Sequence, residues 1–130
     1  MANRFNVKLP VTRDPSEGEV AAVHVHELGA EAYEQELAGA LPVVLDFYAA
    51  GSKPCETLAP RYGAVAEKFA GKVRFLKVLQ ASHAALAAKL GVTAVPAVLF
   101  FKGGVEHGER LTGEEILRTA LKARVEALLP

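Results

Sequence analysis

Apolar residues follow two different spacings along the chain. Three short runs, at residues 43–48, 73–79 and 97–101, consist mostly of apolar residues, which is typical of strands buried on both faces. Residues 55–69 instead carry apolar side chains every three or four positions, which predicts an amphipathic helix, and Pro60 predicts a kink within it. This alternation indicates strands at the centre of the molecule with helices between them.

Weaker signals predict the elements between these segments. Residues 23–26 alternate between valine and histidine, as in a short strand, and residues 30–38 suit a short helix. Ser82 is expected to cap a further helix, which Gly91 ends. These elements place one helix between each pair of successive strands.

The C-terminal part of the chain contains a turn signal and a helix signal. Gly103 and Gly104 predict a tight turn, so the chain is expected to return as an antiparallel strand from Val105. Thr112 and Glu115 have the spacing of a capping box, which predicts the start of a last helix. The apolar face of that helix is expected to carry Leu117, Leu121, Val125 and Leu128.

The order of elements predicts an α/β fold in which a central mixed sheet carries helices on both faces. Residues 1–21 have weak periodicity and are interpreted as an N-terminal arm, with an extra edge strand at residues 5–9 as the alternative. Residues 22–130 are expected to form the folded domain.

Charge and composition exclude several classes of function. The 130 residues include 15 Lys and Arg and 15 Asp and Glu, so no net positive charge favours nucleic acid. No apolar run has the length of a membrane span or a signal peptide, so a cytoplasmic protein without nucleic-acid or membrane partners is expected. The single cysteine, Cys55, excludes an internal disulfide and a cysteine-based zinc site. His24 and His26 lack a third ligand and are interpreted as a solvated or interface face, and neither a metal nor a cofactor is expected.

Residues 46–60 read DFYAAGSKPCETLAP and resemble the active-site segment of the thioredoxin family. That segment has an aspartate in a buried strand, Phe-Trp, then Trp-Cys-Gly-Pro-Cys at a helix start and Ala-Pro one turn later. Residues 92–97 are similar to the loop that carries the family's cis-proline, and residues 100–104 to its strand and hairpin turn. The resemblance covers roughly residues 22–129 and implies a thioredoxin-like fold. The matching residues of the first segment are Asp46, Phe47, Ala49, Pro54, Cys55, Ala59 and Pro60.

The sequence departs from the family pattern at the redox site. Ser52 stands where the family has its first cysteine, Gly51 where it has tryptophan, and Lys53 where it has glycine. Thiol–disulfide exchange needs an attacking thiolate and a second thiol that resolves the mixed disulfide. No histidine lies near Ser52 in the sequence to serve as a base, so its hydroxyl is a poor nucleophile and a helix cap is the more expected role.

Cys55 matches the second cysteine of the family, which is normally shielded. One interpretation is a monothiol site, because a helix N-terminus stabilises a thiolate. The other is a small buried hydrophobe, because a cysteine in apolar surroundings is usually inert.

Asp46 places a carboxylate in an otherwise apolar strand, where burial should raise its pKa. The resemblance implies that Asp46 accepts the proton of the second cysteine and that Lys77, on the next apolar strand, is its neighbour. An Asp46–Lys77 pair that tunes Cys55 is one interpretation, and an inherited buried pair without a task is the other.

The resemblance also implies a cis peptide bond at Pro96, which places the backbone of Val95 beside the site. That backbone could pair with an extended substrate segment, and Gly51, Lys53 and Pro54 would form the rest of the binding surface. The alternative is that Pro96 only shapes the turn.

Two functions follow from the resemblance. The first is a thiol–disulfide oxidoreductase with weak or monothiol-dependent activity, acting on thiol or disulfide segments of proteins or peptides, with glutathione as a further candidate partner. The second is a redox-inactive binding or chaperone-like module. A dithiol assay and the reactivity of Cys55 separate them.

Overall fold

The computed structural model describes residues 22–29 and 32–130. The predicted N-terminal arm, with its alternative strand at residues 5–9, lies outside the described residues. So does the beginning of the helix predicted at 30–38.

The described part of the chain forms a six-stranded mixed sheet. Its strands are β1 (Val25–Glu27), β2 (Val43–Tyr48), β3 (Arg74–Leu79), β4 (Ala97–Lys102), β5 (Val105–Glu106) and β6 (Leu111–Thr112). β2 lies in the middle, with β3 parallel on one side and β4 antiparallel on the other. β1 pairs in parallel with β3 and ends the sheet, whereas β5 and β6 both pair antiparallel with β4.

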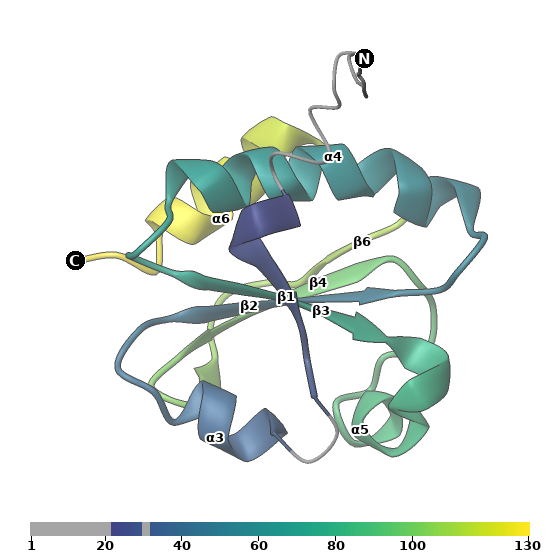
Figure 1. Ribbon diagram of the computed structural model, residues 1–130, viewed down its shortest axis with the longest axis horizontal. Helices are drawn as coiled ribbons and strands as arrows, with labels where there is room; N and C mark the ends of the chain where they lie inside the picture. Colours follow the sequence, from purple (N-terminus) through teal and green to yellow (C-terminus); the bar gives the residue numbers. More distant parts are fainter. Residues whose placement is uncertain (1–21, 30–31) are drawn as a thin grey trace, which may run out of the picture.

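Helices cover both faces of this sheet. α4 (Lys53–Lys68) and α6 (Arg118–Glu126) lie together on one face, and the short helices α3 (Tyr33–Leu37) and α5 (Ala84–Lys89) lie on the other (Figure 1). Two short 3-10 helices, η1 (Ala22–His24) and η2 (Gln80–Ser82), complete the described elements. The predicted α/β sheet with helices on both faces is therefore confirmed.

The alternation of side chains along β2 supplies both halves of the core. Val44 points into the cluster under α4 and α6, whereas Val43, Leu45 and Phe47 point into the cluster under α3 and α5. Asp46 lies between these positions and shares the face of Val44. Among the residues that the structure describes, Asp46 is the one charged residue that is buried.

The first strand is shifted from its predicted position at residues 23–26. Residues 22–24 form the 3-10 helix η1, and the strand runs over Val25–Glu27, because only these three residues lie opposite β3. Val23 is 67% exposed and has no place in the sheet. The alternation of valine and histidine therefore does not mark the paired residues.

The predicted cap of the third helix is wrong, and its end is correct. Ser82 belongs to η2, and α5 begins after His83 with no side-chain cap. Gly91 has a φ of 73°, and the N–H groups of Gly91 and Val92 donate to the carbonyls of Ala88 and Ala87. This is the Schellman arrangement that closes a helix.

The last helix begins later than predicted. Thr112 lies in β6, and α6 starts after Leu117 with no side-chain cap, so the capping box is wrong. Leu117, which was predicted to lie on the buried face, is 48% exposed, and the preceding residue Ile116 is buried instead. Leu121, Val125 and Leu128 are buried as predicted, and the Gly103–Gly104 turn does lead into β5.

Candidate functional site

The loop between β2 and α4 contains the segment that resembles a redox site. α4 begins at Lys53, and its N-cap Ser52 accepts a hydrogen bond from the Cys55 N–H at 3.4 Å. Pro54 occupies the first turn, where its missing N–H costs no helical hydrogen bond. Gly51 has a φ of 78°, which favours glycine over residues with a side chain. Ser52 therefore has the capping role that its sequence predicts.

Cys55 lies in the first turn of α4 and is only 7% exposed. Its Sγ accepts a hydrogen bond from the Ala49 N–H at 3.5 Å. The sulfur thus lies beside a backbone N–H donor and at the positive, N-terminal end of the helix dipole. The low exposure restricts which reagents can reach the sulfur.

Asp46 is held on β2, where 6% of it is exposed. Within the described residues, its Oδ1 is buried and has no hydrogen-bond partner. Burial raises the pKa of Asp46 from 3.8 to about 7, against the opposing attraction of Lys77. A group that titrates near neutral pH can both accept and release a proton there.

A cavity of about 280 Å³ lies between this carboxyl and helix α4. Its polar lining comes from Asp46, Lys77 and Tyr62, and the rest is apolar. The remaining lining residues are Val25, Ala59, Pro60 and Gly63. The predicted kink at Pro60 stays a prediction, and Pro60 itself forms part of the cavity wall.

Lys77 lies opposite Asp46 in the sheet, as its sequence position predicts, but its ion pair is with another residue. Its Nζ is 3.8 Å from Oε1 of Glu27, which lies opposite Lys77 on β1. The hydroxyl of Tyr48 donates to the Glu27 carboxylate at 3.1 Å, and Lys77 Nζ lies 5.6 Å from the centre of the Tyr48 ring. We call Glu27, Tyr48 and Lys77 the edge cluster.

The sequence prediction missed two members of the edge cluster. Tyr48 follows Asp46 by two positions and so shares its face, which is a signal the sequence does contain. Glu27 lies one residue beyond the strand predicted at 23–26, and that error hid its position opposite Lys77.

The predicted substrate-binding residues lie at the same end of β2, in the loop before β4 and around the start of α4. The Val95–Pro96 peptide bond is cis, Pro96 is buried and Val95 is half-buried. Ala97 pairs with Phe47, so Pro96 lies next to the end of β2 from which the loop to Ser52 departs. Gly51 in that loop and Lys53 at the start of α4 are exposed.

The two histidines near the first strand lie on different elements. His24 lies in η1 and His26 on β1, and residues 22–29 and 32–130 contain no group of three or more residues able to hold a metal ion. No helix in these ranges is both long and apolar enough to cross a membrane.

Known proteins resemble this chain in sequence. Thioredoxin H-type from Chlamydomonas reinhardtii is 36% identical over 83 residues, which is 64% of this chain and 74% of that protein. A thioredoxin from Synechocystis is 32% identical over 74% of this chain and 88% of that protein. The chain spans about half to three quarters of the length of the first curated relatives that it matches.

Solved structures resemble it in fold. Thioredoxin f from spinach chloroplast superimposes with a TM-score of 0.71 at 30% identity, covering 81% of this chain and 93% of that one. A mutant thioredoxin from Halobacterium salinarum gives a TM-score of 0.71 at 26% identity, covering 82% and 90% of the two chains. The family model for thioredoxin matches residues 24–127. The chain therefore belongs to the thioredoxin family, with one cysteine where the site segment usually carries two.

Proposed function

We propose that this protein exchanges thiols and disulfides of protein segments through one sulfur, that of Cys55. The observation that carries the proposal is the position of Cys55, in the first turn of α4 with its Sγ accepting the Ala49 N–H at 3.5 Å. Membership of the thioredoxin family supports the class of chemistry. The sequence contains no second cysteine, so the reaction needs an external thiol.

The cycle has two exchange steps. The Cys55 thiolate attacks one sulfur of a substrate disulfide, the S–S bond breaks, and the other sulfur leaves as a thiolate that takes up a proton. An external thiolate, such as that of glutathione, then attacks the substrate sulfur of the mixed disulfide and releases Cys55 as a thiolate. The substrate disulfide is replaced by one with the external thiol, and the protein returns unchanged. Asp46 accepts the proton that Cys55 loses when it ionises.

The proposed substrate-binding surface lies at the end of β2, in the adjacent loops and the first turn of α4. Gly51, Lys53 and Pro54 form one side of the proposed binding surface, and the backbone of Val95 before Pro96 forms the other. An extended segment binds there through main-chain hydrogen bonds, as in strand addition. We further propose residues 22–130 as the functional domain and the cytoplasm as its compartment.

An insulin-reduction assay with dithiothreitol tests the absence of dithiol turnover. The protein should reduce insulin only slowly, because no second thiol in the chain resolves the mixed disulfide and each one waits for attack by dithiothreitol. Ser52→Cys should raise the rate about tenfold or more by supplying that thiol. Cys55→Ala in the same background is the control and should abolish the gain. Rapid insulin reduction by the unchanged chain would overturn the proposal.

Burial of Cys55 favours a second candidate, a thioredoxin-fold binding module without redox chemistry. With 7% of its surface exposed, Cys55 could be inert in the folded state. Alkylation with iodoacetamide distinguishes the two functions. A folded protein that reacts at a measurable, pH-dependent rate supports exchange, and a thiol that reacts only after unfolding in urea supports the binding module.

A further inference from the structure

Two carboxylates compete for one ammonium in this structure. Lys77 lies opposite Asp46 on one side and opposite Glu27 on the other, in the register of three parallel strands. Side chains at paired positions point to the same face of a sheet, so all three extend toward α4. The Nζ of Lys77 is 3.8 Å from Glu27, whereas Asp46 keeps a buried oxygen without a hydrogen-bond partner in the described residues.

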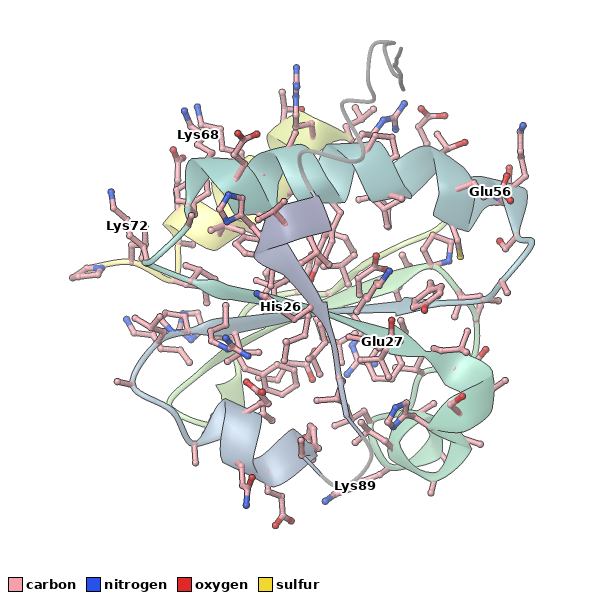
Figure 2. The ribbon with its side chains drawn as sticks, in the orientation of Figure 1. His26, Glu27, Glu56, Lys68, Lys72 and Lys89 are labelled. Atoms are coloured by element: carbon pink, nitrogen blue, oxygen red, sulfur yellow. The ribbon has the colours of Figure 1, made fainter. Side chains whose placement is uncertain are left out.

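The edge cluster is built to hold the ammonium at the edge of the sheet. Glu27 receives the Tyr48 hydroxyl at both carboxylate oxygens, each at 3.1 Å, so its orientation is set independently of Lys77. The Tyr48 ring lies 5.6 Å from Lys77 Nζ and adds a second attraction to the same place. Figure 2 shows Glu27 on edge strand β1, at the front of the sheet.

Movement of the Lys77 side chain would change this arrangement. Lys77 also lines the cavity of about 280 Å³ that contains Asp46, so its flexible stem has space to turn inward. An inward ammonium would pair with the orphan oxygen of Asp46 and favour its charged form.

We propose that Glu27 is a positioning residue: by holding the Lys77 ammonium at the sheet edge, it keeps that ammonium from pairing with Asp46 and so determines the charge that Asp46 carries beneath α4. The effect on the site rests on the proposed function, because Asp46 there accepts the proton of Cys55. Burial raises the pKa of Asp46 to about 7, and Lys77 in its present position offsets this rise only in part. The groups that face Asp46 are Lys77 from β3, Tyr48 from its own strand, Tyr62 from α4 and the uncharged Val98 from β4, with Glu27 of β1 beyond Lys77.

The test measures the titration of Asp46 directly, by the carboxyl ¹³C shift of the full chain between pH 4 and 9. Glu27→Gln keeps an acceptor for Tyr48 and removes the charge that holds Lys77. The midpoint of Asp46 should fall by roughly half a pH unit or more, because Lys77 then turns inward. Glu27→Asp should restore most of the original midpoint. Glu67→Gln is the control, because it makes the same charge change on the exposed surface of α4. It should leave the midpoint of Asp46 unchanged.

A double variant shows whether Glu27 acts through Lys77 or directly. In a Lys77→Met background, Glu27→Gln should no longer shift the Asp46 midpoint. An unchanged midpoint in Glu27→Gln alone, or an equal shift with and without Lys77, would overturn the proposal. The titration needs no turnover, so it can succeed even if Cys55 is inert. The pH profile of Cys55 alkylation in the same variants then tests the link to exchange.

Discussion

Asp46 loses nearly all of its contact with water when the chain folds, since only 6% of it stays exposed. A carboxylate in such surroundings is costly unless it is paired or protonated. The structure gives it neither a hydrogen bond at Oδ1 nor a direct ion pair within the described residues. The fold therefore tolerates this residue by keeping its carboxyl protonated up to near-neutral pH. As a result, the free energy of unfolding must depend on pH.

The sign of that dependence follows from the two pKa values. The folded protein has a pKa of about 7 at Asp46 and the unfolded chain one of 3.8, so the folded state binds more protons between these values. The contribution of Asp46 to the free energy of unfolding thus falls as the pH rises from about 4 to 7. Asp46→Asn should remove this contribution and be more stable than the parent at pH 8 by about 2–4 kcal/mol.

Urea unfolding of both proteins at pH 4, 6 and 8 measures the difference. Other carboxylates contribute to both curves alike, so the gap between the two proteins isolates Asp46. The gap should open between pH 4 and 8. A constant gap over this range would mean that Asp46 ionises as freely in the folded state as in the unfolded chain.

At the scale of secondary-structure elements, the start of α4 decides where the sulfur lies. Ser52 caps the helix and its oxygen takes the N–H of Cys55, so one residue both starts the helix and orients the thiol-bearing turn. Serine at this position supplies an N-terminal cap but no thiol nucleophile.

Removal of this cap gives a prediction with a matched control. Ser52→Ala should lower the free energy of unfolding by about 1 kcal/mol, because a helix N–H loses its acceptor. Ser82→Ala should change it by less than about 0.5 kcal/mol, because Ser82 lies exposed in η2 and caps no helix. Urea unfolding at pH 7 distinguishes the two, and equal losses would contradict the capping role of Ser52.

The sequence predicted elements well where the apolar pattern was strong and poorly where a few polar residues carried the prediction. The three apolar runs became β2, β3 and β4, and the periodic segment became α4. The predicted helix caps at Ser82 and Thr112 were wrong, because Ser82 lies in the 3-10 helix η2 and Thr112 in strand β6. A capping motif of two residues contributes too little to determine the structure where these residues form other backbone hydrogen bonds.

The candidate site was predictable only in part for the same reason. Ser52, Asp46 and Cys55 lie within one continuous segment, so the sequence shows them together. The ion pair of Lys77 with Glu27 depends on the register between β1 and β3, which joins residues 50 positions apart. The predicted strand ended one residue before Glu27, which was enough to hide the pair.

On the scale of the whole molecule, Tyr62 joins the helical layer to the sheet. It projects from α4, is fully buried, and its hydroxyl lies 2.7 Å from the carbonyl of Leu76 and 3.0 Å from that of Val44. These carbonyls belong to β3 and β2, so one side chain spans the two central parallel strands. The Tyr62 ring also packs edge-on against Phe75 at 5.5 Å.

Two substitutions separate the hydroxyl of Tyr62 from its ring. Tyr62→Phe should lower the free energy of unfolding by about 1–2 kcal/mol, because the hydrogen bonds to the strands are lost while the ring stays. Tyr62→Leu should cost more, because the ring contact with Phe75 is lost as well. Thermal and urea unfolding measure both. Equal stability of the Phe variant and the parent would show that the hydroxyl does not hold the layers together.

The position of Glu27 on the outermost strand separates the control of the buried acid from the core of the fold. β1 has only three residues and a single neighbour in the sheet, so substitutions there disturb little of the core. The buried acid, by contrast, lies under a long helix and between two central strands. With the proposed role of Glu27, a substitution on this outer strand would change the proton affinity of the buried acid and leave the core that folds the chain unaltered.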